Sequence, residues 1–145
     1  SIMPILKYEY TPLFRLDPVS KDYFALFVPF IPIRLSMNYR ISKSLINCLF
    51  DTGADVNLFP ATMATFLGVS LKKGKLVEHL GIGNVSVLAY RHRIKIFVDQ
   101  YRFNTFADFS EQQGVPLLGR ITFAEHFKRV CLYGKGEDAY IELEC

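Results

Sequence analysis

The chain has 145 residues, which fits one domain because domains typically span roughly 100 to 200 residues. Half of the residues are hydrophobic, including 13 Phe and 8 Tyr, and this composition excludes a disordered chain. The formal net charge of +3 is mild, and its basic clusters at residues 72–75 and 91–93 are less dense than the stripes of nucleic-acid-binding proteins. We interpret both clusters as solvated loop or strand faces and expect no nucleic-acid partner.

The cysteines and the apolar segments indicate in which cellular compartment the protein is located. Cys48, Cys131 and Cys145 have no metal-ligand spacing and require no oxidising environment, so the predicted location is cytoplasmic. No signal peptide is visible. The longest apolar stretch, residues 23–35, is too short for a membrane span and contains two prolines, so no membrane segment is expected in the visible chain.

The chain reads mostly as short strands. In chain order the expected strands are Tyr23–Val28, Ile31–Ser36, Leu45–Phe50, Val85–Tyr90, Arg93–Val98, Tyr101–Phe109, Arg129–Tyr133 and Ala139–Glu144. Two short helices are expected, at residues 60–68, between Pro60 and the stop at Gly68, and at residues 121–128. This pattern predicts a mainly β, all-β class with a small closed barrel-like or sandwich-like domain. The single domain covers residues 1–145, with residues 1–30 as an amino-terminal extension that is a pro-segment, part of a dimer interface or an arm over a cleft.

The run Asp51-Thr52-Gly53-Ala54-Asp55 directly follows an apolar strand and is the strongest functional signal. A carboxylate inside an apolar pattern is costly unless a function or a partner justifies it, and glycine lets the backbone turn sharply beside a ligand. An aspartic protease presents its catalytic carboxylate in this way, although the triplet alone also fits an ordinary turn. The run occurs once, and the chemistry needs two facing carboxylates, so a second chain must supply the other.

Two further features accompany the run. The glycine-bracketed segment Gly81-Ile82-Gly83 lies between strands that pair as a hairpin, and it exposes backbone N–H groups as a flap over a substrate does. Alone it is also a plain hairpin turn.

The second feature is Leu117-Leu118-Gly119-Arg120, before the second expected helix. The glycine allows close backbone packing, and Arg120 offers a bidentate partner for a carboxylate such as Asp55. Alone this segment is also a strand end with a surface arginine.

In this order, the three features resemble the retropepsin-like aspartic proteases, the single-domain homodimeric branch related to retroviral proteases. The resemblance covers roughly residues 31–130 and points to a cellular, bacterial-type member. It implies an aspartic endopeptidase (a hydrolase acting in proteolysis) in which Asp51 is the catalytic residue. Thr52 then hydrogen-bonds across the dimer axis, and the Gly53 carbonyl accepts a substrate N–H.

The resemblance assigns the remaining site residues as well. Ala54 and Asp55 bind substrate, and Asp55 is also paired with Arg120. The flap residues close over the substrate and the packing residues support the loop; they are Gly81, Ile82 and Gly83, and Leu117, Leu118 and Gly119. Apolar cleft walls from Val56, Ile82, Val85 and Leu117 favour cleavage at apolar sites.

The chain also departs from the viral pattern. Asn84 stands where a retroviral flap usually continues with glycine, and the chain ends in a hairpin rather than one terminal strand. These departures leave the dimerisation mode open but not the need for a homodimer.

The expected mechanism needs two carboxylates that share one proton and activate a water, with no cofactor and no metal. The histidines His79, His92 and His126 have no compact metal-site spacing. The alternative is a catalytically weak or inactive dimeric module that binds peptides or proteins on the same fold.

Overall fold

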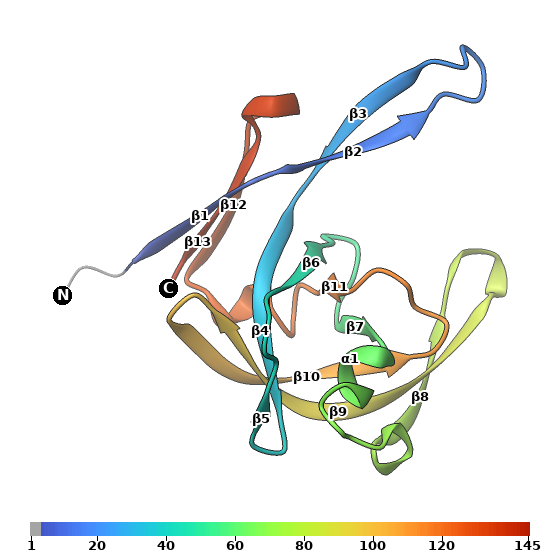
Figure 1. Cartoon of the computed structure of the whole chain (residues 1–145), viewed down its shortest axis with the longest axis vertical. Helices are drawn as coiled ribbons and strands as arrows, with labels where there is room; N and C mark the ends of the chain where they lie inside the picture. Colours follow the sequence, from blue (N-terminus) through green and yellow to red (C-terminus); the bar gives the residue numbers. More distant parts are fainter. Residues whose placement is uncertain (1–3) are drawn as a thin grey trace. The chain divides into compact units, whose positions relative to one another are not determined.

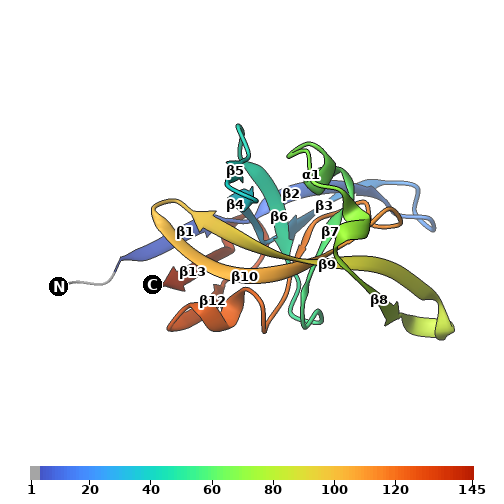
Figure 2. The same ribbon diagram turned by 90° about the horizontal axis from the view of Figure 1, so that it is seen from below.

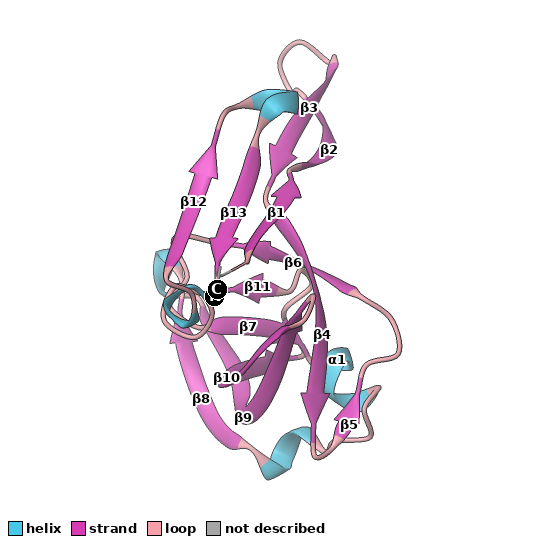
Figure 3. Ribbon diagram, turned by 90° about the vertical axis from the view of Figure 1, so that its left-hand side faces the viewer, coloured by secondary structure: helices cyan, strands magenta, loops and turns pink. Residues whose placement is uncertain are grey.

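The computed structural model describes residues 4–145, apart from the side chain of Ile82. The strands are β1 Ile5–Glu9, β2 Thr11–Leu16, β3 Tyr23–Val28, β4 Phe30–Met37, β5 Arg40–Ile41, β6 Ile46–Phe50, β7 Asn57–Pro60, β8 Lys75–Leu80, β9 Ser86–Val98, β10 Tyr101–Ser110, β11 Leu117–Leu118, β12 Arg129–Tyr133 and β13 Tyr140–Glu144. The helical segments are α1 Thr62–Thr65 and the 3₁₀ turns η1 Leu71–Lys73, η2 Ile82–Asn84, η3 Ala124–His126 and η4 Gly136–Asp138. Figure 3 shows how strongly strands predominate, as the sequence predicted.

The chain divides into two compact units. Unit 1 combines Ser1–Phe30 with Phe127–Cys145, and unit 2 is Ile31–His126. The Asp51 run and the other two motifs all lie in unit 2, so unit 2 holds the candidate site.

Unit 2 is a closed six-stranded β-barrel. Its strands follow one another in the order β4-β6-β11-β7-β10-β9, and pairing between β4 and β9 closes the ring (Figures 1 and 2). Strand β5 extends β4, and β8 extends β9 as a hairpin. The closed barrel confirms the fold class that the sequence predicted.

The barrel core forms by simple alternation along the strands. In β4 every second residue is buried, beginning with Ile31 and ending with Met37, so one face of the strand lines the core. Phe59 on β7 and Phe109 on β10 are fully buried and meet edge to face, with 5.7 Å between ring centroids. The parallel pairing of β7 with β10 brings these two residues into register.

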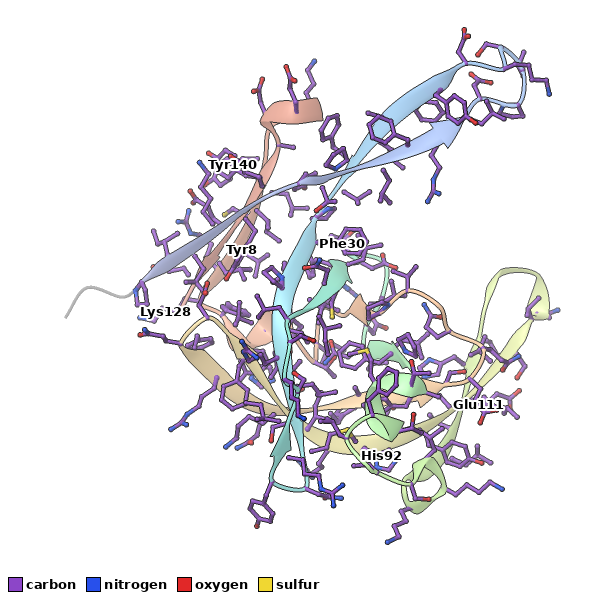
Figure 4. The ribbon with its side chains drawn as sticks, in the orientation of Figure 1. Tyr8, Phe30, His92, Glu111, Lys128 and Tyr140 are labelled. Carbon is purple, nitrogen blue, oxygen red and sulfur yellow. The ribbon has the colours of Figure 1, made fainter. Side chains whose placement is uncertain are left out.

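Unit 1 contains a three-stranded sheet and a two-stranded ribbon. The sheet has the order β1-β13-β12, and its β12–β13 hairpin is the one predicted from the sequence. Tyr140 stacks on Tyr133 with ring centroids 4.9 Å apart, and the Lys7 ammonium lies 4.2 Å from the Tyr140 ring centre (Figure 4). The antiparallel ribbon of β2 and β3 completes the unit and extends away from this sheet (Figure 1).

The β2–β3 ribbon leaves large apolar side chains exposed. The most exposed members, with exposed fractions of 44% to 90%, are Phe14, Leu16, Val19, Tyr23, Phe24 and Leu26. They lie on both faces of the ribbon, because cross-strand pairs alternate between the faces. A lone two-stranded hairpin is marginally stable in water, so this surface is suited to contact with another molecule.

Three details differ from the sequence-based expectations. The expected strands Val85–Tyr90 and Arg93–Val98 are one strand, β9, since residues 91–93 continue the pairing with β10. The expected helix over residues 121–128 is wrong, and only the 3₁₀ turn η3 forms there. The N–H of Ile121, at the start of this segment, donates to the carbonyl of Asp55, which is far away in the sequence. The helix expected at residues 60–68 is shortened to α1, because Pro60 pairs within the sheet.

Among residues 4–145, no helix is long and apolar enough to cross a membrane.

Candidate active site

Asp51 lies immediately after strand β6, in a position that the strand's alternation dictates. Cys48 and Phe50 point into the core and are buried, so the residues between and after them point the other way. Asp51 therefore leaves the barrel wall half-exposed instead of being buried. Burial raises the pKa of the Cys48 thiol, which fits a core role for that residue.

The segment Asp51–Asp55 (the Asp51 loop) turns on itself through the side chain of its first residue. The N–H of Gly53 donates to Asp51 Oδ1 at 2.9 Å, and the N–H of Ala54 donates to the Asp51 carbonyl at 3.1 Å. Thr52 and Gly53 are exposed at the crest of this turn. One carboxylate oxygen is thus oriented by the backbone.

A second segment, residues 116–121, holds the loop from both sides. The Asp51 N–H donates to the Leu118 carbonyl at 3.1 Å, while the N–H groups of Arg120 and Ile121 donate to the carbonyls of Ala54 and Asp55 at 2.8 and 2.9 Å. In addition, Leu118 pairs in parallel with Phe50. The loop therefore has its entry and its exit fixed to the same neighbouring segment.

Gly119 packs against the backbone at the base of the loop. A Cβ atom at this position would lie 2.5 Å from the carbonyl carbon of Val56 and 2.7 Å from that of Asp55. Its N–H donates to the side-chain carbonyl of the buried Asn57 at 3.0 Å. Gly119 is therefore in close backbone contact with the end of the Asp51 loop.

Asp55 and Arg120 form an ion pair at the edge of the loop. Arg120 Nη2 donates to Asp55 Oδ1 at 2.6 Å, and the Asp55 carboxylate raises the pKa of the Arg120 guanidinium above its ordinary value. Both side chains are more than half exposed, so solvent screens the pair and it adds little stability. It does leave the second Asp55 oxygen available at the surface.

The other predicted site residues lie on a separate hairpin. Strands β8 and β9 pair from Lys75 opposite Arg91 to Leu80 opposite Ser86, and the connection carries Gly81, Ile82 and Gly83. Figures 1 and 2 show this tip projecting away from the barrel strands. Gly83 has φ of +79° and Asn84 has φ of +60°, so the tip turns through the left-handed region, which both residue types tolerate.

The histidines have separate partners. His79 contacts Asp108, His92 contacts the Leu71 carbonyl at 2.9 Å (His92 is labelled in Figure 4), and His126 stacks on Phe103. Within residues 4–145, no group of three or more His, Cys, Asp or Glu side chains is placed to hold a metal ion. A pocket of about 710 Å³ does not include Asp51, so it is not the predicted substrate cleft. Its lining residues are Arg40, Ile41, Ser42, Lys43, Ser44, Ile46, Met63, Phe66 and Leu67.

Known structures share this arrangement of strands. The chain is similar to a retropepsin-like aspartic protease from Rickettsia conorii, with 17% identity and a TM-score of 0.59, over 97% of this chain and 92% of that one. This chain has the retropepsin-like fold. It is also similar to the EIAV protease in complex with the inhibitor HBY-793, with 22% identity and a TM-score of 0.47, over 64% of this chain and 82% of that one. No protein-family model and no curated protein matches the sequence.

Sequence reasoning missed two buried polar residues in the barrel. Asn57 is fully buried, its amide donates to the carbonyls of Phe106 and Thr122, and its backbone N–H donates to the Thr122 hydroxyl at 2.7 Å. Asp108 is also fully buried, and it pairs with Arg91, which we had interpreted as part of a solvated cluster. Each lies inside an apolar run, as Asp51 does, and that signal could have identified both.

Proposed function

We propose that this protein is an aspartic endopeptidase that works as a homodimer, with one Asp51 from each chain. The observation that carries the proposal is the Asp51 loop itself, a half-exposed carboxylate at the end of a barrel strand, fixed by residues 116–121 on a retropepsin-like fold. The loop occurs once in the sequence. A second copy of the chain is therefore the simplest source of the second carboxylate.

In the proposed dimer the two Asp51 carboxyls lie about 3 Å apart across a two-fold axis, where they cannot both ionise and so share one proton. The ionised member takes a proton from a bound water, and the neutral member donates its proton to the scissile carbonyl. The water oxygen attacks the carbonyl carbon and forms a tetrahedral gem-diol. The carboxyl that has gained the water proton then protonates the amide nitrogen, the other carboxylate takes a proton from a gem-diol hydroxyl, and the C–N bond breaks. No covalent enzyme intermediate forms, and no metal is needed.

The substrate is an extended peptide or protein segment. Asp55, ion-paired on one oxygen, binds substrate backbone with the other, while the Gly53 carbonyl accepts a substrate N–H. Thr52 at the loop crest reaches across the two-fold axis to the other copy, and the β8–β9 tip, with Gly81 and Gly83, closes over the peptide as a flap.

The β2–β3 ribbon supports contact with a second copy. Phe14, Leu16 and Tyr23 are exposed on one face of the ribbon, because Phe14 and Leu16 are two residues apart on β2 and Leu16 pairs with Tyr23 on β3. The same face of a second copy would remove these large apolar side chains from water. An isologous interface between equal ribbons satisfies the two-fold symmetry that the site requires.

Digestion of a peptide library, read by mass spectrometry, tests the function. Wild-type protein should cleave, Asp51→Asn should lose cleavage while remaining dimeric, and Asp138→Asn should cleave normally because Asp138 is exposed in unit 1. Cleavage by Asp51→Asn at the wild-type rate would refute the catalytic assignment. Specific peptide binding without cleavage by wild type would instead support the alternative, a peptide-binding module.

Mixing the two forms tests the shared site. In dimers formed from equal amounts of wild type and Asp51→Asn, about one quarter carry two Asp51 residues. Activity per wild-type chain should therefore fall by about half. Unchanged activity per wild-type chain would show that one chain suffices.

A further inference from the structure

The buried carboxylate of Asp108 joins three strands at the root of the β8–β9 hairpin. Asp108 lies on β10 and is fully buried. Arg91 on β9 donates to it in a bidentate manner, from Nε to Oδ1 at 2.8 Å and from Nη2 to Oδ2 at 3.0 Å. His79 on β8 places Nε2 2.6 Å from Oδ2. The group connects both strands of the hairpin to the barrel strand beside them.

This cluster contributes more to the relative positions of the strands than to the stability of the core. A buried carboxylate is costly unless charged partners and hydrogen bonds satisfy it, and here both oxygens are occupied. The Arg91 guanidinium also lies 4.1 Å from the centre of the Phe106 ring, and Asp108 raises the pKa of Arg91. Apolar residues of similar volume give comparable or greater stability in a core, whereas the Asp108 carboxylate links His79 on β8 to β10, two strands that are not neighbours in the sheet.

A second set of contacts lies where the hairpin leaves the barrel. The pairing of β9 with β10 ends at Tyr90 opposite Phe109, so Leu88 lies beyond the ladder. Side chains replace the missing partner strand: the Ser110 hydroxyl donates to the Leu88 carbonyl at 2.7 Å, and the Leu88 N–H donates to Gln112 Oε1 at 3.0 Å. The backbone of the hairpin is therefore bound on its barrel side for two residues more than the sheet alone provides.

The three side chains that hold the hairpin come from the end of β10 and from the turn after it. Asp108 and Ser110 lie two residues apart on β10, and Gln112 lies in the following turn, where its backbone N–H donates to the Ser110 hydroxyl at 3.1 Å. Glu111 (labelled in Figure 4) lies between them in the sequence and is exposed. We propose that Asp108, Ser110 and Gln112 are positioning residues, a clamp that sets the angle at which the β8–β9 hairpin carries its tip. The proposal rests on the function above, in which this tip closes over a peptide. The clamp fixes the root, and closure is then confined to the glycine-bearing end.

Hydrogen exchange on the full-length protein tests the clamp without reference to activity. In His79→Ala the carboxylate loses its link to β8, so amide exchange across residues 76–90 should accelerate about tenfold or more, with β6 and β7 unchanged. His79→Gln retains a donor near the Nε2 position and should restore most of the protection. Gln112→Ala should accelerate exchange around Leu88 in the same way, and the matched control Glu111→Ala should not.

Peptide cleavage provides the second readout. A misplaced flap weakens substrate binding before it alters the chemistry, so His79→Ala and Gln112→Ala should raise KM several-fold with kcat changed less than twofold. Unchanged exchange in the hairpin of both variants would overturn the clamp. Faster exchange throughout unit 2, with no rescue by His79→Gln, would equally overturn it, since the role would then be general stability. If the wild-type protein cleaves nothing, the exchange data still decide the clamp, and only the proposed function fails.

Discussion

The side-chain carbonyl of Asn57 accepts a hydrogen bond from the backbone N–H of Gly119 at 3.0 Å, beneath the Asp51 loop. The same side chain donates to the carbonyls of Phe106 and Thr122. One buried amide thereby joins the segment after the Asp51 loop to the segment that flanks it. The loop's position depends on this contact as well as on its own turn.

Asn57→Ala should lower the free energy of unfolding by about 1–3 kcal/mol, because it leaves the buried Gly119 N–H without its acceptor and removes a donor from the Phe106 carbonyl. The Thr122 carbonyl keeps its hydrogen bond from the Thr105 hydroxyl at 2.7 Å. Denaturant unfolding followed by circular dichroism measures the change. Asn104→Ala is the matched control: Asn104 is exposed on β10, and its replacement should change stability by less than about 0.5 kcal/mol. Equal effects of the two variants would contradict the role assigned to Asn57.

Gly119→Ala should be more damaging still. The new Cβ would lie 2.5 Å from a backbone carbon of Val56, and backbone atoms have little freedom to move away. We expect a loss of about 3 kcal/mol or more, with loss of the loop geometry around Asp51. In contrast, Gly114→Ala should be well tolerated, because a Cβ there has no heavy atom within 4 Å. Normal stability of the Gly119 variant would show that the close approach is relaxed in solution.

Much of the fold could be predicted from local patterns. The apolar run before Asp51, the strand expected at residues 31–36 and the hairpin over residues 129–144 each form where the sequence placed them. These elements are short runs of apolar and β-branched residues between turn residues, which the sequence displays directly. The helix expected at residues 121–128 failed because tertiary bonds override propensity: the Ile121 N–H donates to Asp55, far away in sequence.

The supporting polar residues could not be placed in the same way. Asp108 and Arg91 face each other because β9 runs without a break through residues 91–93, and the sequence predicted two strands there. Two separate strands place Arg91 in the connection between them, where a basic side chain is expected to be solvated. Asp108 lies between two apolar residues in the sequence, Ala107 and Phe109. The cost of burying a carboxylate, which was the argument applied to Asp51, therefore applies to Asp108 as well.

The β2–β3 ribbon provides a prediction about assembly. Phe14→Ser and Tyr23→Ser together remove two large side chains that are 72% and 75% exposed. If the ribbon is buried between copies, the double variant should raise the dimer dissociation constant about tenfold or more, as measured by sedimentation. Hydrogen exchange of unit 2, measured in the full-length double variant, is the control for misfolding. Exchange in this unit should be the same as in the wild type. An unaltered dissociation constant would exclude the ribbon from the dimer interface.

His126 provides a prediction about pH. Its ring stacks on Phe103 with centroids 4.3 Å apart, and burial lowers its pKa below the ordinary value of 6.5, with Glu125 acting weakly in the opposite direction. The unfolded chain therefore binds more protons than the folded chain between the folded pKa and 6.5, so the free energy of unfolding rises with pH across that window and falls on acidification. His126→Phe keeps an aromatic ring against Phe103 and removes the titration. Unfolding measured from about pH 5 to 8 should show wild type losing stability relative to this variant as the pH falls below neutrality. A constant difference between the two proteins would contradict the burial effect, and a relative gain by wild type in acid would reverse its sign.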